Sequence, residues 1–600
     1  MTQTADRASL DPRYTWNLAA LFETPEAWEA ELQAVEAATD ALAEHAGRLN
    51  DAAALLAHLR AADEVGVRMR RVYYYGYLGA ALDTRDQTAR GRAARISGLP
   101  ARMASATAFF EPELLALGEA RLAEVAREEP GLELYGALFR QIEKHRPHVR
   151  SAEVEAVLGQ VLSPFEGSGG AYEALTDSDL TFAPVQTPEG EVALGQSTVA
   201  QLWGSPDRSV RRAAFESFAD AYLAHRNTLT ELYVTRVKQA SFEARVRGYP
   251  SSAAGVLGEK RSSMAALQAV VEGFQANAPI WHRYFAVRRR ALGVERLGPE
   301  DLHAPLARET RTIPYEEASE LVLASVAPLG DEYAATLRRG LEQGRWVDVF
   351  PAPGKPAAQF SAGMELQPYV LMSYSGSFPS VGVLAHELGH AMHQYSFNAT
   401  QPTVYHDMGS LECEVPSNFG QMLLRAHLLA TETDPELQLA VLDEGFANFY
   451  RYFFQMPLLA RFELAVHEAV DRGEGLTADR LSAIMADLLR EGYGPEIEVD
   501  ERAAILWAQF GHLYSPFYTF EYTVGISCAA ALSEALLAGE PSARENYLAF
   551  LNTGTSLPSL EALKLAGVDL STPEPIARGF ATLGRMVDQL ERLLDERERL

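Results

Sequence analysis

The sequence predicts a mostly α-helical protein with two lobes, and three observations support this prediction. The chain has 600 residues, more than one hydrophobic core usually organises. Apolar residues recur at three- and four-residue spacing in residues 24–143, and again from residue 206 almost to the C-terminus. Only two short segments, residues 180–194 and 367–374, have the pattern of β-strands.

The first helical segment defines an expected N-terminal lobe at residues 1–165. This segment is rich in Ala, Glu and Arg, all of which favour helices. Glycine and proline interrupt the pattern at Gly47, Pro100 and Pro130, where we expect one helix to end and another to begin.

A connecting segment is expected at residues 166–205. The composition changes at the glycine-rich residues 166–170, and a short hairpin follows in the strand-like residues 180–194. Residues 206–600 then form the second expected unit, which is helical except for the β-like residues 367–374. We therefore expect one small sheet inside the second unit.

The charge of the chain excludes some classes of partner. Lys and Arg number 53 against 81 Asp and Glu, which gives a net charge of −28. Such a field repels phosphate backbones and anionic lipid surfaces, so we expect neither nucleic acid nor a membrane as a partner. No uninterrupted apolar run reaches the roughly 18 residues that a membrane-spanning helix needs.

The cysteine content predicts a reducing compartment. Cys413 and Cys528 are the two cysteines of the chain, too few for a disulfide framework and without the paired spacing of a thiolate zinc site. The first sixteen residues mix charged and polar side chains and lack the apolar core of a signal peptide. We therefore expect a cytoplasmic protein.

A metal-binding motif follows the β-like segment. Residues 386–390 read His-Glu-Leu-Gly-His inside an apolar helical pattern. Residues four apart lie on one face of a helix, so His386 and His390 can bind one zinc ion while Glu387 reaches a water beside it. Composition alone would produce such a motif by chance in only ~0.04 chains of this kind.

The third zinc ligand must come from another element. His393 lies on nearly the same face, but three ligands along one straight helix span about 10 Å, too far for bonds near 2 Å. A carboxylate from a neighbouring helix completes such sites most often. Glu412 and Glu414 both stand where the next helix begins, and the chemistry of the sequence does not choose between them.

The motifs resemble the thimet oligopeptidase family of zinc metallopeptidases. In that family an E-x-x-S segment supplies the third ligand, which implies Glu414 from the Glu-Val-Pro-Ser sequence at residues 414–417. Within the family the chain is most similar to the bacterial oligoendopeptidase F branch. Three segments carry this similarity: Trp-Asn-Leu at residues 16–18, Pro-Tyr-Val-Leu-Met-Ser-Tyr at residues 368–374 and Ala-Gly-Val-Asp at residues 566–569.

An aromatic segment near the C-terminus resembles the substrate-binding region of the same family. On composition alone, residues 512–525 form a cluster of the kind that more often packs than catalyses. The resemblance implies that His512, Tyr518 and Tyr522 bind substrate and stabilise the tetrahedral intermediate. Two positions differ from family patterns, Phe520 from the oligoendopeptidases and Gly525 from the thimet branch. The resemblance further implies that residues 369–374 border the cleft and pair with the substrate backbone.

These observations together predict a two-lobed helical zinc endopeptidase with a small sheet beside the active-site cleft. One zinc ion per chain, held by His386, His390 and Glu414, would activate a water for which Glu387 acts as general base. The resemblance implies short oligopeptides as substrates. One alternative is a dipeptidyl carboxypeptidase, and another is a helical binding protein without activity. The sequence specifies no oligomeric state.

Overall fold

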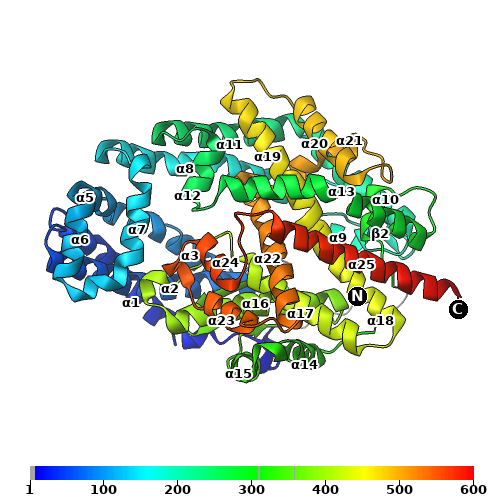
Figure 1. The fold of residues 1–600 in the computed structure, drawn as a ribbon, viewed down its shortest axis with the longest axis horizontal. Coiled ribbons are helices and arrows are strands. Elements are labelled where there is room, and N and C mark those ends of the chain that lie inside the picture. The colour runs from blue at the N-terminus through cyan, green and yellow to red at the C-terminus, as the bar shows by residue number, and fades with distance from the viewer. Residues whose placement is uncertain (1–6, 197, 308–310, 357–358, 600) are drawn as a thin grey trace.

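A computed structural model shows the fold and describes residues 7–196, 198–307, 311–356 and 359–599. Helices dominate and the sheets are small, so the predicted fold class is confirmed. Helices of the N-terminal part form one end of the molecule in Figure 1. These helices are α1 (Pro25–Ala41), α2 (Ala52–Leu82), α3 (Gln87–Ile96), α4 (Leu99–Ala106), α5 (Phe110–Leu117), α6 (Glu119–Glu128) and α7 (Gly136–His145).

The remaining helices form two groups, and the chain passes from the first group to the second, back to the first and again to the second. Most of the first group lies along the top of Figure 1, and most of the second along the bottom. The first group comprises α8 (Ala152–Ala174), α9 (Val199–Trp203), α10 (Arg208–Ala224), α11 (Arg226–Arg247), α12 (Ser252–Glu259), α13 (Met264–Leu292), α19 (Met456–Asp471), α20 (Ala478–Tyr493) and α21 (Glu501–Ala504). The second comprises α14 (Tyr315–Ser325), α15 (Asp331–Glu342), α16 (Phe378–Thr400), α17 (Glu414–Thr431), α18 (Pro435–Phe449), α22 (Thr519–Leu537), α23 (Ala543–Leu551), α24 (Ser559–Ala566) and α25 (Glu574–Arg599).

The glycine-rich residues 166–170 do not interrupt the helix in which they lie. They lie inside α8, which continues to Ala174. A glycine costs a helix about 1 kcal/mol relative to alanine. Packing of α8 against α11, with Tyr172 buried in the main core, offsets that cost. The expected hairpin is present as β1 (Val185–Thr187) and β2 (Gly190–Val192), while the division into units at residues 165 and 205 stays a prediction.

Separate hydrophobic cores support the two parts of the chain. Residues between Leu49 and Ile142 form a small core of their own, whereas the main core runs from Tyr172 to Leu594. A third cluster joins the N-terminal residues Trp16 and Leu78 to the sheet of the second part. The N-terminal helices are therefore attached to the rest of the molecule through this sheet.

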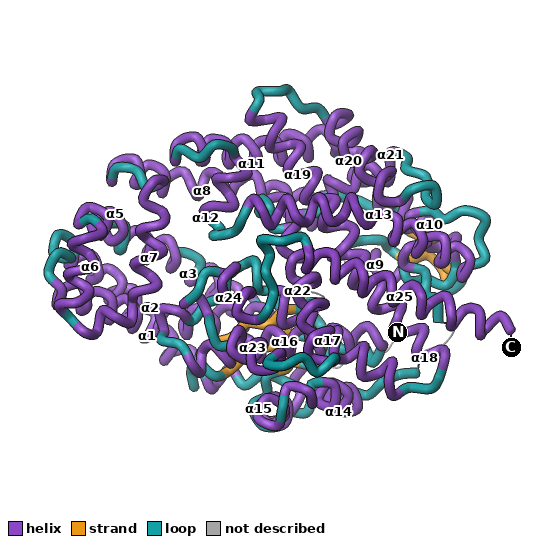
Figure 2. Tube along the Cα trace, viewed as in Figure 1, coloured by secondary structure: helices purple, strands orange, loops and turns teal. Residues whose placement is uncertain are grey.

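The three-stranded sheet packs against α16 (Figure 2). Its order is β3 (Val347–Asp348), β5 (Gln367–Leu371) and β4 (Phe360–Met364), with β3 parallel and β4 antiparallel to β5. β5 is thus the middle strand. The expectation that residues 369–374 pair with substrate is wrong for residues 369–371, because neighbouring strands already occupy both edges there. The outer strands are β3 and β4.

Helix α22 lies at the centre of the second group. It packs against α17, α19 and α25, and most of its residues are buried. By length and composition it could cross a membrane, but 78% of its apolar stretch is buried inside the protein, as in a core helix. The position of α22 brings the C-terminal aromatic segment beside α17.

Candidate metal centre and active site

Two histidines of α16 stand one helical turn apart at the start of the site. The ring centroids of His386 and His390 are 4.9 Å apart, and each side chain is only 12% exposed. Both side chains lie toward the first turn of α17. The predicted helical spacing therefore places two imidazoles side by side.

Glu414, the first residue of α17, completes this group. Its Oε2 atom lies 3.3 Å from Nε2 of His386 and 3.7 Å from Nε2 of His390. Among the described residues, these three form the one group of at least three possible ligands close enough to hold a metal ion, with donor atoms within 4.8 Å of one another. Glu412 lies apart from the group, and its Oε1 accepts a hydrogen bond from the backbone of Gly409 at 2.8 Å.

Two glycines allow the helices to approach closely enough for Glu414 to reach the histidines. A Cβ atom on Gly389 would lie 2.3 Å from the carbonyl oxygen of Pro416, so no larger residue fits between α16 and α17. A Cβ on Gly525 would lie 2.6 Å from Cβ of Glu414. In this structure a side chain at position 525 would therefore displace Glu414.

Hydrogen bonds to other residues hold the side chains of His386 and His390 in place. His386 Nδ1 lies 2.9 Å from Oε1 of Gln421, and the amide nitrogen of Gln421 donates to Glu444 at 2.9 Å. His390 makes its own hydrogen bond to the backbone of Cys413. Hydrogen bonds of this kind fix the orientation of the imidazole and leave Nε2 directed at Glu414.

The electrostatics of the group suit a bound cation. Burial would raise the pKa of Glu414, but His390 and His386 outweigh burial and lower this pKa to about 2. Burial lowers the pKa of His390 to about 4, whereas for His386 the hydrogen bond and charge of Glu414 overcome burial and raise the pKa to about 9. Without a metal, the group thus has an ionised carboxylate on Glu414 and one extra proton, which His386 carries. A divalent cation would replace that proton, so the donor set fits a metal.

Glu387 lies beside the group without belonging to it. Its side chain is 5% exposed, and its Oε2 atom has no hydrogen-bond partner among the described residues. Burial raises the pKa of Glu387 to about 7, although His386 lowers it and Glu414 adds to the rise. A carboxyl group with a pKa near neutrality can both accept and return a proton.

The predicted aromatic residues lie together on the other side of the site. The ring centroid of Tyr522 is 5.0 Å from that of Tyr518 and 5.7 Å from that of His512. The charge of Glu414 affects the pKa of all three side chains, so they are within its electrostatic reach. Burial lowers the pKa of His512 to about 4, which leaves a neutral imidazole that can donate one N–H.

A buried glutamate positions the loop that carries Tyr518. Glu463 Oε1 accepts the backbone N–H of Phe517 at 2.8 Å, and Oε2 accepts the hydroxyl of Thr519 at 2.5 Å. Phe517 has a φ of +54°, a conformation that this residue type rarely adopts without support. Lys260 stands over the Tyr518 ring, with Nζ 5.4 Å from its centroid.

The structure adds residues that the sequence reading did not single out. Gln421 lies seven positions after Glu414, so helical periodicity could have placed both on one face of α17. Tyr452 stacks on Tyr522 with centroids 5.0 Å apart, and Glu463 supports the Tyr518 loop, but both come from segments without any recognisable motif. His393, rejected as a ligand, is buried against Phe550.

A helical fold with a buried His-His-Glu group, and a free glutamate beside it, defines a helical metallopeptidase. Comparison with known proteins agrees. The sequence model of peptidase family M3 matches residues 201–582, and the oligopeptidase F model matches residues 113–182. The chain belongs to peptidase family M3, and the resemblance found in the sequence is confirmed.

Individual relatives extend over nearly the whole chain. The chain is 32% identical to oligopeptidase PepF of Bacillus subtilis, covering 99% of this chain and 89% of the relative. It is 28% identical to group B oligopeptidase PepB of Streptococcus agalactiae, with 98% of each chain covered. The crystal structure of oligoendopeptidase-F from Enterococcus faecium superposes with a TM-score of 0.75 at 29% identity, over 97% of this chain and 100% of that one. The protein is thus a metalloendopeptidase that acts on peptides.

Proposed function

We propose that the protein hydrolyses internal bonds of short oligopeptides with one zinc ion per chain, held by His386, His390 and Glu414. The observation that carries this proposal is the placement of three donor atoms within 4.8 Å, beside a buried glutamate that is not a ligand. Two imidazoles and one carboxylate are a common donor set for catalytic zinc, which keeps a position open for the reaction. When bound, zinc would supply Lewis-acid polarisation and would acidify a water.

Glu387 moves the proton in this proposal. Its carboxylate accepts a proton from the attacking water and passes that proton to the amine that leaves. The pKa of Glu387, raised by burial, suits both transfers near neutral pH. Because Oε2 has no partner among the described residues, this atom is available to the water and then to the amine.

Tyr518, Tyr522 and His512 stabilise the oxyanion that develops at the scissile carbonyl. Burial raises the pKa of both tyrosines, so their hydroxyl groups remain protonated and donate hydrogen bonds. The neutral His512 donates through one ring nitrogen. Such donors contribute most when they are held in place before the charge develops, and the stacking of Tyr452 on Tyr522 provides that support.

Short peptides are the proposed substrates. Support comes from the relatives, which are named as oligopeptidases and oligoendopeptidases. A cytoplasmic location stays part of this proposal, consistent with the free cysteines Cys413 and Cys528.

Metal analysis and peptide cleavage together test the proposal. The purified protein should contain about one zinc per chain, lose activity with a chelator and regain it with added zinc. Internally quenched peptides should be cut at internal bonds, whether or not the C-terminus is amidated, with products identified by mass spectrometry. Loss of cleavage on amidation would favour the dipeptidyl carboxypeptidase, and zinc binding without any cleavage would favour the binding protein.

A further inference from the structure

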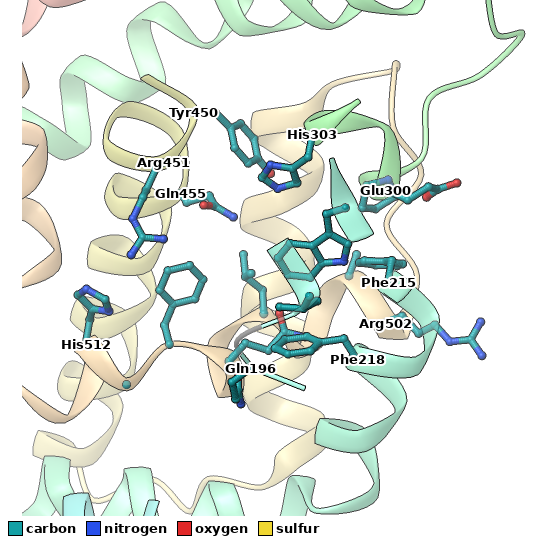
Figure 3. A pocket seen from close by; sticks show the side chains of 18 of the residues that line it. Gln196, Phe215, Phe218, Glu300, His303, Tyr450, Arg451, Gln455, Arg502 and His512 are labelled. Carbon is teal, nitrogen blue, oxygen red and sulfur yellow. The ribbon is translucent and has the colours of Figure 1, made fainter. Parts of the chain in front are cut away.

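A cavity of about 320 Å³ adjoins the proposed catalytic centre. Its lining is largely aromatic and apolar, but it also carries several groups that donate hydrogen bonds. Figure 3 shows Arg451 and His512 on one side of this cavity, with Glu300 and Arg502 on the opposite side. The lining residues that matter here are Trp203, His303, Arg451, Gln455, Phe510 and His512.

Arg451 is the cation of this cavity that lacks a counter-charge. It lies in the π-helical segment Tyr450–Gln455, a type of distortion often found at functional sites. Its side chain is exposed, and its guanidinium carbon lies 5.8 Å from the ring centroid of Phe510 and 6.0 Å from that of Tyr452. Within the part of the chain that the structure describes, no carboxylate pairs with Arg451.

The other charged groups that line the cavity are already neutralised. Arg502 forms an ion pair with Asp220 at 2.7 Å, and Glu300 forms one with Arg212 at 3.0 Å. Desolvation by the residues around His303 lowers its pKa to about 4, which leaves the imidazole neutral near pH 7. In a protein with a net charge of −28, an arginine without a counter-ion beside a cavity is a site for an anion.

The cavity is continuous with the catalytic residues. His512 lines the cavity and also lies beside Tyr518 and Tyr522. Tyr452, the neighbour of Arg451 in the chain, stacks on Tyr522. A peptide bound at the catalytic centre can therefore extend into the cavity, where the indole N–H of Trp203 has no hydrogen-bond partner among the described residues.

We propose that Arg451 binds a carboxylate of the substrate peptide and thereby determines which peptides the enzyme prefers. The guanidinium group offers two parallel donors that match a carboxylate. The carboxylate belongs either to the C-terminus of the peptide or to an Asp or Glu side chain. This inference rests on the proposed function, because it takes the residues around His512 as the place where the peptide is cut.

The test compares three peptides of one sequence with wild type, Arg451→Gln and Arg451→Lys. One peptide has a free C-terminus and one Glu, one is amidated at the C-terminus, and one has Gln in place of Glu. For the peptide that retains the bound carboxylate, Arg451→Gln should raise KM roughly 10- to 100-fold, as loss of a charge-assisted hydrogen bond predicts. Arg451→Lys should recover part of this loss. The exposed Arg490→Gln, whose parent pairs with Asp487, serves as the matched control.

The three peptides identify the source of the carboxylate. If amidation abolishes the difference between wild type and Arg451→Gln, Arg451 binds the C-terminus. If the change of Glu to Gln abolishes it, Arg451 binds an acidic side chain. Equal effects of Arg451→Gln on all three peptides, or no effect on any, would overturn the proposal.

A binding measurement separates this inference from the proposed function. The dissociation constants of the same peptides are measured by fluorescence anisotropy on the Glu387→Gln background, where turnover is not needed. A 10- to 100-fold weaker binding that depends on one carboxylate supports the role of Arg451 even if the assigned mechanism is wrong. The inference is contradicted if the Glu387→Gln variant and the double variant Glu387→Gln, Arg451→Gln bind all three peptides with equal affinity. This holds whatever activity the enzyme has. Thermal unfolding of each variant establishes that the fold is intact.

Discussion

Nδ1 of His386 lies 2.9 Å from Oε1 of Gln421, and this contact determines which ring nitrogen faces Glu414. Because the amide nitrogen of Gln421 donates to Glu444, its oxygen is left to accept. Nδ1 of His386 must then carry a proton, and Nε2 is the nitrogen that can bind a metal once a metal displaces its proton. The same network continues through Arg425, whose Nε lies 3.0 Å from Glu444.

The first prediction concerns this contact. Gln421→Leu removes the acceptor and should weaken zinc binding roughly 10- to 100-fold, as loss of a hydrogen bond to a metal-binding histidine usually does. Competition with a graded chelator measures the affinity. Gln438→Leu, whose parent bonds only to the backbone of Glu432, is the control and should bind zinc normally. Unchanged affinity in Gln421→Leu would show that the contact does not orient His386.

Glu387→Gln should separate metal binding from turnover. The amide keeps the shape of the side chain but cannot act as a base, so zinc should stay bound while kcat falls about 10²- to 10⁴-fold. Metal content and steady-state kinetics on one quenched peptide measure the two effects. A normal rate of cleavage by this variant would mean that another group takes the proton.

Replacement of Glu414 by Gln should lower zinc affinity by orders of magnitude, because its carboxylate contacts both histidines. His386→Ala and His390→Ala should also lose the metal. Glu412→Gln is the matched control, since its parent contacts the backbone of Gly409 instead. Chelator competition ranks the variants, and a larger effect at position 412 than at position 414 would contradict the proposed ligand set.

Tyr518→Phe and Tyr522→Phe should lower kcat far more than they raise KM, because an oxyanion donor acts mainly in the transition state. Loss of one such donor typically costs roughly 10²- to 10³-fold in kcat. Phe keeps the ring packing, so zinc content and the melting temperature should not change. If both variants keep kcat within about threefold of wild type, less than 1 kcal/mol of barrier, His512 becomes the principal donor candidate.

A buried histidine of α19 predicts how stability depends on pH. Nδ1 of His467 lies 2.8 Å from the hydroxyl of Ser252, and burial lowers the pKa of this histidine to about 3 against the opposing charge of Asp471. The unfolded chain binds a proton near pH 6.5, before the folded one does. Stability should therefore be complete above pH 6.5 and decrease as the pH falls from 6.5 toward 3.

His467→Gln provides the test of this pH dependence. Gln can still bond to Ser252 but cannot titrate, so its melting temperature should fall less than that of wild type between pH 7 and pH 5. Both proteins are measured with the same excess of zinc, which makes any loss of metal common to them. Parallel curves for the two proteins would show that His467 does not contribute to acid sensitivity.

Local patterns in the sequence determined the helical fold class, the short β-segments and the pair of histidines on one face of a helix. These features depend on residues a few positions apart, where helical geometry leaves little freedom. The family resemblance, carried by short motifs, pointed to Glu414 and to the aromatic segment. The glycine-rich residues 166–170 lie inside α8, because packing of this helix outweighs the weak local preference of glycine against a helix.

Contacts between residues remote in the chain were decided only by the tertiary structure. Gly525 lies against Glu414, more than a hundred positions away, because α22 crosses α17 there. Arg451 shares a cavity with His512, and β5 is the middle strand of its sheet, for the same kind of reason. Such distances follow from how whole helices and strands pack, and packing depends on the combined shape of many side chains that no single segment contains.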